Sequence, residues 1–258
     1  MNALVQQFGE QQVAGFFLVL ARVSPLFVLA PLFSSNLIPV RVRGIVAVAL
    51  AIGLAPVVAQ KRIPMDTFTF GGLVGKELLV GLGFAFALGA LFAALSVAGT
   101  FLDTSIGFSF GSIVDPITGS SAAVLAQLYA LIGVLIFIAI GGDAWVIQGL
   151  ARTYETVPME SFPSLGIMTS GALAAFAGIF GAAIQVAGPV LLALILTDAA
   201  FGMVSRVVPQ LNVFAVGFAA KIVVGLLILG VTLPFLSGWL TEELQASVAA
   251  ALDMLRVG

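Results

Sequence analysis

Long apolar runs, separated by short polar or glycine-rich stretches, dominate the pattern along the chain. A helix needs about 20 consecutive apolar residues to cross the hydrocarbon core of a membrane. Six runs reach or approach that length, so the pattern predicts an all-α membrane protein with about six long apolar helices. The runs are Val13–Phe33, Gly44–Ala59, Leu78–Ala98, Ala122–Ile140, Gly171–Leu196 and Leu211–Leu236.

Prolines inside three of these runs predict that some helices are kinked or broken. Pro25 lies in the first run, Pro189 in the fifth and Pro234 in the sixth. Proline removes a backbone hydrogen bond and its ring crowds the preceding turn. After the last run, residues 237–258 predict an amphipathic C-terminal tail with Thr241 as its N-cap. We expect residues 1–258 to form a single subunit.

One stretch, residues 103–121, breaks the apolar pattern and reads "DTSIGFSFGSIVDPITGSS". It has too much Gly, Ser and Pro for a stable helix and too many large apolar side chains for a solvated loop. Irregular backbone at membrane depth is tolerated only inside protein or beside a water-filled cavity. We therefore expect an irregular loop over residues 106–121 that plugs a pore, with an apolar surface loop as the alternative. The expected plug residues are Ile106, Gly107, Phe108, Phe110, Gly111, Ile113, Asp115, Pro116, Ile117 and Gly119.

Composition supports a membrane protein and excludes most catalytic chemistry. The 258 residues are 61% hydrophobic and 9% charged, against roughly 25% charged in soluble domains. A net charge of -2 gives no electrostatic basis for binding nucleic acid. The absence of Cys and His removes thiol nucleophiles, imidazole bases and most transition-metal sites. No phosphate-binding loop and no Ser-x-x-Lys motif is present, so we predict a protein that is not an enzyme and needs no cofactor.

Small residues recur at every fourth position of two runs. A ridge of small side chains allows the backbone of another helix to approach closely, which drives helix association in membranes. The ridges predict assembly with other subunits, with packing inside the chain's own bundle as the alternative. The expected packing residues are Gly81, Ala85, Gly89 and Ala93 in the third run and Gly178 in the fifth.

Four charges lie within or at the ends of apolar runs: Lys76, Glu77, Asp198 and Lys221. Because charges at membrane depth are costly, we expect them to be buried and paired between helices, or to extend toward the membrane surface, rather than to relay ions. Adjacent residues point about 100° apart on a helix, so Lys76 and Glu77 need not pair with each other. The sequence leaves open whether Asp198 and Lys221 pair.

Three stretches resemble the FliR family of flagellar type III export-gate proteins. The first is "GFSFGSIVDPITGSS", followed after an apolar helix by "GGDAWVIQGLARTYETVP". The second is "VVPQLNVFAVGFAAKIVVGL", and the third is the N-terminal "ARVSPLFVLAPLFSSNLIPVRVRGIVAVALAIGLAP". Together they follow the order expected of the family and cover nearly the whole chain.

The resemblance implies a pore-forming subunit of a helical hetero-oligomeric gate in the bacterial inner membrane, within the flagellar basal body. The implied partners are FliP-, FliQ- and FlhB-like subunits, membrane lipid, and unfolded protein substrates in transit. It also implies that a loop matching residues 106–121 helps to close the pore. The alternatives are a homologous injectisome export-gate subunit and a stand-alone transporter of small solutes or ions. A transporter would favour paired intramembrane charges and an inverted repeat, neither of which is clear in the sequence.

Overall fold

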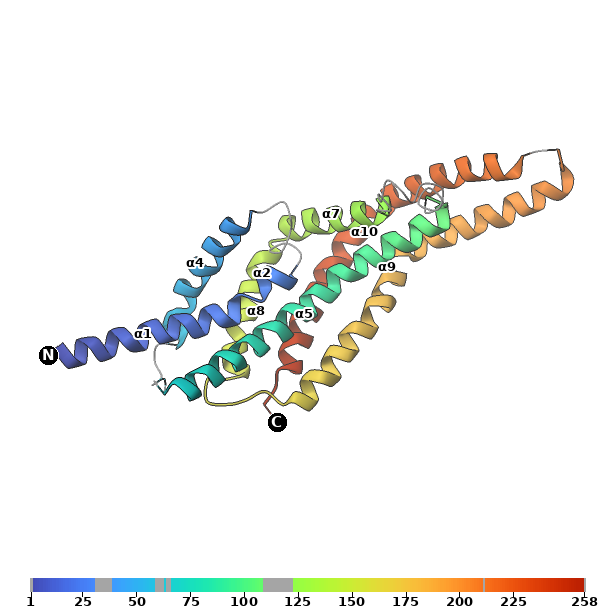
Figure 1. Ribbon diagram of the computed structural model, residues 1–258. Coiled ribbons are helices and arrows are strands. Elements are labelled where there is room, and N and C mark those ends of the chain that lie inside the picture. The colour runs from blue at the N-terminus through green and yellow to red at the C-terminus, as the bar shows by residue number, and fades with distance from the viewer. Residues whose placement is uncertain are drawn as a thin grey trace, which may run out of the picture. The chain divides into compact units, whose positions relative to one another are not determined.

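The fold is built from helices, and no strand occurs among the residues described. The computed structural model describes residues 2–30, 39–58, 63, 66–108, 123–210 and 212–257 (Figure 1). The predicted all-α class, with several long apolar helices, is confirmed. The helices are α1 (Asn2–Val23), α2 (Leu26–Leu29), α4 (Val40–Val58), α5 (Thr67–Ile106), α7 (Val124–Ala139), α8 (Gly142–Thr156), α9 (Leu165–Val207) and α10 (Val213–Met254).

Helices α5, α9 and α10 are longer than the apolar runs that predicted them. They contain 40, 43 and 42 residues, about twice the length needed to cross a hydrocarbon core at 1.5 Å per residue. Within the described part of the chain, four helices are long and apolar enough to cross a membrane. The number is five if the bent α7–α8 pair forms one span.

The prolines have different effects in different helices. Pro25 separates α1 from α2, as expected. Pro189 and Pro234 lie inside α9 and α10, which continue through them, and Pro56 lies inside α4. A proline with neighbours packed on its helix can therefore interrupt hydrogen bonding without ending the helix.

A glycine lies at the bend between α7 and α8. Helices α7 and α8 meet at 76°, and Gly141, the residue between them, has a φ of 68°. This left-handed backbone conformation is one that glycine adopts without steric cost. The predicted run Ala122–Ile140 therefore ends where expected, but the change of direction was not anticipated.

One of two expected or possible helix caps is present at the start of α5, and the other, at Thr241, is absent. Asp66 caps α5, because its carboxylate accepts hydrogen bonds from the Thr69 N–H at 3.1 Å and the Thr69 hydroxyl at 3.0 Å. These bonds, chiefly that from the Thr69 backbone, hold the pKa of Asp66 below its ordinary value. The expected N-cap role of Thr241 is wrong: its hydroxyl donates to the Ser237 carbonyl inside α10. The tail from residue 237 therefore begins as a continuation of α10.

The chain divides into two compact units, each made of segments that are separated in sequence. Unit 1 contains Met1–Ala90, Gly141–Ala175 and Leu244–Gly258, and unit 2 contains Leu91–Ile140 and Phe176–Glu243. In unit 1, α1 packs against α4. The core of that unit includes Val80, Phe84 and Leu150, whereas the core of unit 2 includes Leu95, Phe137 and Leu194.

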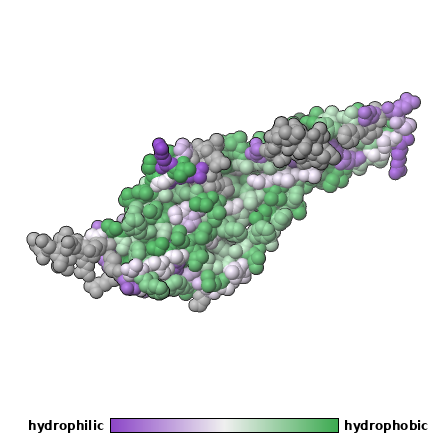
Figure 2. All heavy atoms as spheres, in the orientation of Figure 1, coloured by the Kyte–Doolittle hydropathy of each residue, from purple (hydrophilic) through white to green (hydrophobic). Residues whose placement is uncertain are grey.

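The three long helices differ in how much of their apolar surface the chain itself covers. In their most apolar segments, 61% of α5 is buried, against 28% of α9 and 17% of α10. Hydrophobic residues cover most of the described surface visible in Figure 2. Large exposed apolar surfaces are typical of faces covered by lipid or by partner proteins.

Candidate functional site

Unit 1 contains a fully buried ion cluster, which is formed by Arg22 of α1 and by Lys76 and Glu77 of α5. The Arg22 Nε donates to Glu77 Oε2, and Lys76 Nζ lies 3.1 Å from Glu77 Oε1. All three side chains are inaccessible to solvent. Lys76 and Glu77 thus pair, although they are neighbours on one helix. A charged group in such a place must be paired, because an isolated buried charge is very costly.

The same cluster holds the C-terminal end of α8. Arg22 donates to the Thr153 hydroxyl and the Val157 carbonyl, both at 3.1 Å. Lys76 donates to the carbonyls of Pro158 and Met159, at 3.1 and 2.9 Å. These carbonyls lie just after the last residue of α8, and their partial negative charge helps to stabilise the two buried cations. The cluster therefore ties α1, α5 and α8 together.

Arg22 is the member of this cluster that the sequence analysis missed. It is a lone cation within the run Val13–Phe33, and that position was the available signal. Its guanidinium also stacks on the Tyr154 ring, 3.9 Å from the centroid. Each polar contact of Arg22 is to another helix or to the turn after α8, so its role is structural.

A second ion pair lies in unit 2, where Lys221 of α10 meets Asp198 of α9 at 2.7 Å. The question that the sequence left open is thereby answered, because the two residues pair. The Lys221 side chain is 21% exposed and the Asp198 side chain is 56% exposed. The expectation that Asp198 is buried is wrong, since it lies on an exposed part of α9. Lys221 also donates to the Ser105 carbonyl in the last turn of α5, at 3.3 Å.

The small-residue ridge of α5 packs against its own chain. A Cβ added to Gly81 would lie 2.2 Å from the Arg22 carbonyl oxygen, and one added to Gly89 would lie 3.2 Å from the Leu29 carbonyl oxygen. Ala85 is fully buried and Ala93 is partly exposed. The ridge thus packs α5 against α1 and α2. For α5, the small residues therefore serve packing inside the chain's own bundle, which was the alternative to assembly with other subunits. Gly178 differs, because a Cβ there would meet nothing within 4 Å.

Gly81→Ala is expected to destabilise the chain by about 1–3 kcal/mol, the usual cost of forcing a methyl group into a packed interior. The reason is that the new Cβ would press on backbone, which cannot move aside as a flexible side chain does. Gly178→Ala, in open space, is the matched control. Thermal unfolding of the purified chain in detergent measures both, and equal melting temperatures would contradict the close packing of α5 on α1.

Most of the expected plug lies outside the described residues: Phe110, Gly111, Ile113, Asp115, Pro116, Ile117 and Gly119. Its first residues are described. Ile106 is the last residue of α5 and is 2% exposed, so the expected start of the irregular loop at Ile106 is wrong. The helix ends there, and Gly107 follows with a φ of 104°. The Phe108 ring lies 6.4 Å from that of Phe218 on α10.

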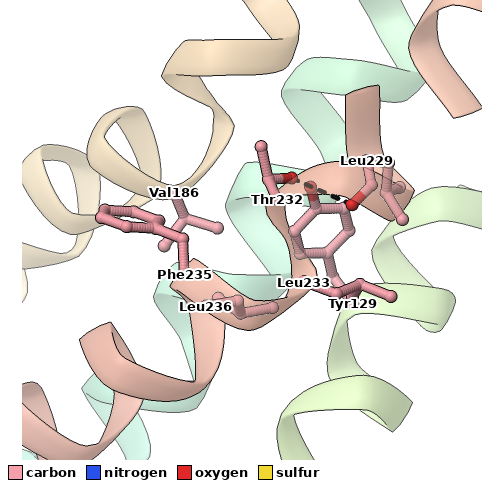
Figure 3. Close-up of a pocket in the computed structure, with 7 residues that line it drawn as sticks. All are labelled: Tyr129, Val186, Leu229, Thr232, Leu233, Phe235 and Leu236. Carbon is pink, nitrogen blue, oxygen red and sulfur yellow. Dashed lines mark hydrogen bonds between the residues drawn. The ribbon is translucent and has the colours of Figure 1, made fainter. Parts of the chain in front are cut away.

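A small pocket in unit 2 lies between α7, α9 and α10 (Figure 3). The Thr232 hydroxyl donates to the Leu229 carbonyl at 3.0 Å, so this hydroxyl is already engaged. Tyr129 supplies the other polar group. Among the described residues, its lining contains no carboxylate and no amine, so they provide no acid–base pair there. The lining residues are Tyr129, Val186, Leu229, Thr232, Leu233, Phe235 and Leu236.

These features define an all-helical protein embedded in a membrane, with charges that join its own helices and with long apolar faces left open on α9 and α10. Sequence comparison then places the chain: it belongs to the bacterial export proteins, family 1, whose family model matches residues 13–247. The family resemblance seen in the three sequence stretches is thereby confirmed.

Individual relatives carry two kinds of name. The chain is 30% identical to the flagellar biosynthetic protein FliR of Bacillus subtilis, over 89% of this chain and 88% of the relative. It is 28% identical to FliR of Escherichia coli, over 86% of this chain and 85% of the relative. It is also 27% identical to the surface presentation of antigens protein SpaR of Shigella flexneri, over 82% of each.

Proposed function

We propose that residues 1–258 form a pore-forming, non-enzymatic subunit of a flagellar type III protein export gate in the bacterial inner membrane. The observation that carries this proposal is the family match over residues 13–247, together with relatives named FliR along most of the chain. Unfolded flagellar subunits are the proposed cargo, and FliP-, FliQ- and FlhB-like subunits are the proposed partners within the basal body.

The length of α9 supports a partner-bound subunit. At 43 residues, this helix extends about 64 Å at 1.5 Å per residue, whereas the hydrocarbon core is about 30 Å thick. Large apolar side chains are exposed along all of it, from Leu165 and Leu173 through Phe180 and Leu196 to Val207. This length exceeds the hydrocarbon core even though α9 bends along its course (Figure 1), and coverage of the remaining apolar side chains by partner proteins supports the proposal.

The size of the particle tests the proposal. The chain is co-expressed with FliP- and FliQ-like subunits of the same organism and purified in a gentle detergent, and the mass of the particle is measured. We expect a complex that contains all three proteins. A lone monomer that binds a small solute tightly would overturn the proposal and favour the stand-alone transporter.

The identity of the export system is tested separately. The SpaR relatives raise the alternative of an injectisome gate. Deletion of the chain's gene in its own organism is expected to remove flagella and swimming, both restored by the gene on a plasmid. Normal flagella with loss of effector secretion would assign the chain to an injectisome instead.

Gly178→Leu is expected to lower the recovery of partner subunits several-fold while leaving the melting temperature of the purified chain unchanged. Gly178 is exposed on α9 and a Cβ there would meet nothing within 4 Å, so the chain itself leaves open space where a partner helix could approach closely. Gly178→Ala is the graded control, with a smaller loss. Full recovery of the partners with Gly178→Leu would show that this face meets lipid.

A further inference from the structure

The last turn of α5 holds the first turn of α7 through one buried carboxylate. Asp103 is 0% exposed. Its Oδ2 accepts hydrogen bonds from the N–H groups of Leu125 at 3.0 Å and Ala126 at 3.1 Å, and its Oδ1 also accepts from the Leu125 N–H, at 3.1 Å. The first N–H groups of a helix lack partners within the helix. The N-cap residue of α7, Ala123, provides no side-chain hydrogen bond, so Asp103 supplies the missing cap from a different helix.

Gly99, one turn before Asp103, brings the two backbones close enough for this cap. A Cβ added at Gly99 would lie 2.4 Å from the Ala126 Cα and 2.5 Å from the Leu125 carbonyl oxygen. Further along the same pair of helices, Leu95 packs against Gly133. Since residue numbers rise along α5 as they fall along α7, the two helices form a closely packed antiparallel hairpin.

Helix α10 holds the same turn of α5 independently. Lys221 donates to the Ser105 carbonyl, one of the final carbonyls of α5 that lack a partner within the helix. The Ile106 side chain packs closely against Gly225 of α10, where an added Cβ would lie 2.7 Å from Ile106 Cδ1. The end of α5 is therefore fixed by α10, and the start of α7 is fixed to α5 by Asp103.

We propose that Asp103 is a positioning residue that sets the spacing between the last turn of α5 and the first turn of α7, and that it acts as a hydrogen-bond acceptor rather than through its charge. Nothing else polar among the described side chains joins these two turns. This proposal concerns the spacing alone and does not rest on the proposed function.

The native sequence suits a direct measurement because it contains no cysteine. Thr104→Cys and Val124→Cys place two spin labels on exposed positions beside the contact, in the otherwise unchanged full-length chain in detergent. Dipolar broadening between the labels reports the spacing of the two turns. Asp103→Leu is expected to reduce this broadening at least twofold, because its side chain accepts no hydrogen bond.

Asp103→Asn is the matched control. Its amide oxygen can occupy the place of Oδ2 and accept from both N–H groups, so we expect the broadening of the unsubstituted chain. Unchanged broadening in Asp103→Leu would overturn the proposal, and a loss in Asp103→Asn as large as that in Asp103→Leu would overturn the acceptor role. If Asp103→Leu does not accumulate, Asp103→Ser, which is too short to reach both N–H groups, is expected to show the same loss. Since no partner or cargo is present, failure here is separate from failure of the proposed function.

Discussion

Glu77→Gln is expected to prevent the chain from accumulating in the membrane. The change removes the carboxylate that Arg22 and Lys76 share, and it leaves the buried Arg22 guanidinium with the Thr153 hydroxyl and the Val157 carbonyl. Removal of one partner from a buried ion pair typically costs about 3–5 kcal/mol. Since whole domains are stable by only about 5–15 kcal/mol, we expect a large loss of folded protein. Quantitative immunoblotting of membranes and thermal unfolding in detergent measure it.

Glu155→Gln is the control, because Glu155 has the same charge and lies exposed on α8. It is expected to accumulate normally and to unfold at the temperature of the unsubstituted chain. If Glu77→Gln behaved in the same way, the cluster would have to be hydrated in the membrane, and its proposed role in joining α1, α5 and α8 would be wrong.

The features that the sequence predicted well are those that depend on short stretches of chain. Apolar run length determines whether a helix can cross a membrane, and this property predicted the all-α class. Pro25 breaks the helix locally, as its missing N–H requires. The N-terminal start of α5 was not predicted. Its first residues, "TFTFGGLVGKE", are only weakly apolar, and they are buried in part through contacts with residues distant in sequence.

Partners of charged and small residues depend on the tertiary structure and were predicted less well. Arg22 and Glu77 are 55 residues apart in the chain, so no local pattern joins them. The spacing of Gly81 and Gly89 correctly indicated a close helix contact, but it carried no information on which helix makes that contact. The exposure of Asp198 depends on how α9 packs, and its place near the end of an apolar run did not determine it.

Shortening the segment 109–122 is expected to leave the gate assembled but permeable to ions and small dyes. The expected plug residues Phe110, Ile113 and Ile117 can exclude water from a narrow path, with about 1.5–3 kcal/mol for each fully buried apolar side chain. A seal of a few such contacts closes a pore at rest and still yields to a passing chain. Phe108 and Ala123 must be retained, because Phe108 packs on Phe218 and Ala123 precedes the helix turn that Asp103 caps. Dye and ion flux in cells that carry the assembled gate measure the barrier.

A second variant separates the apolar seal from the length of the segment. Replacement of Phe110, Ile113 and Ile117 by Ser keeps every residue of backbone but removes the side chains that exclude water. If an apolar seal closes the pore, this full-length variant leaks as much as the shortened one. If the segment closes the pore by its bulk alone, only the shortened variant leaks. An intact barrier in both, with assembly confirmed by co-purification of the partners, would reduce residues 109–122 to a connection between α5 and α7 and would move the search for the seal to another subunit.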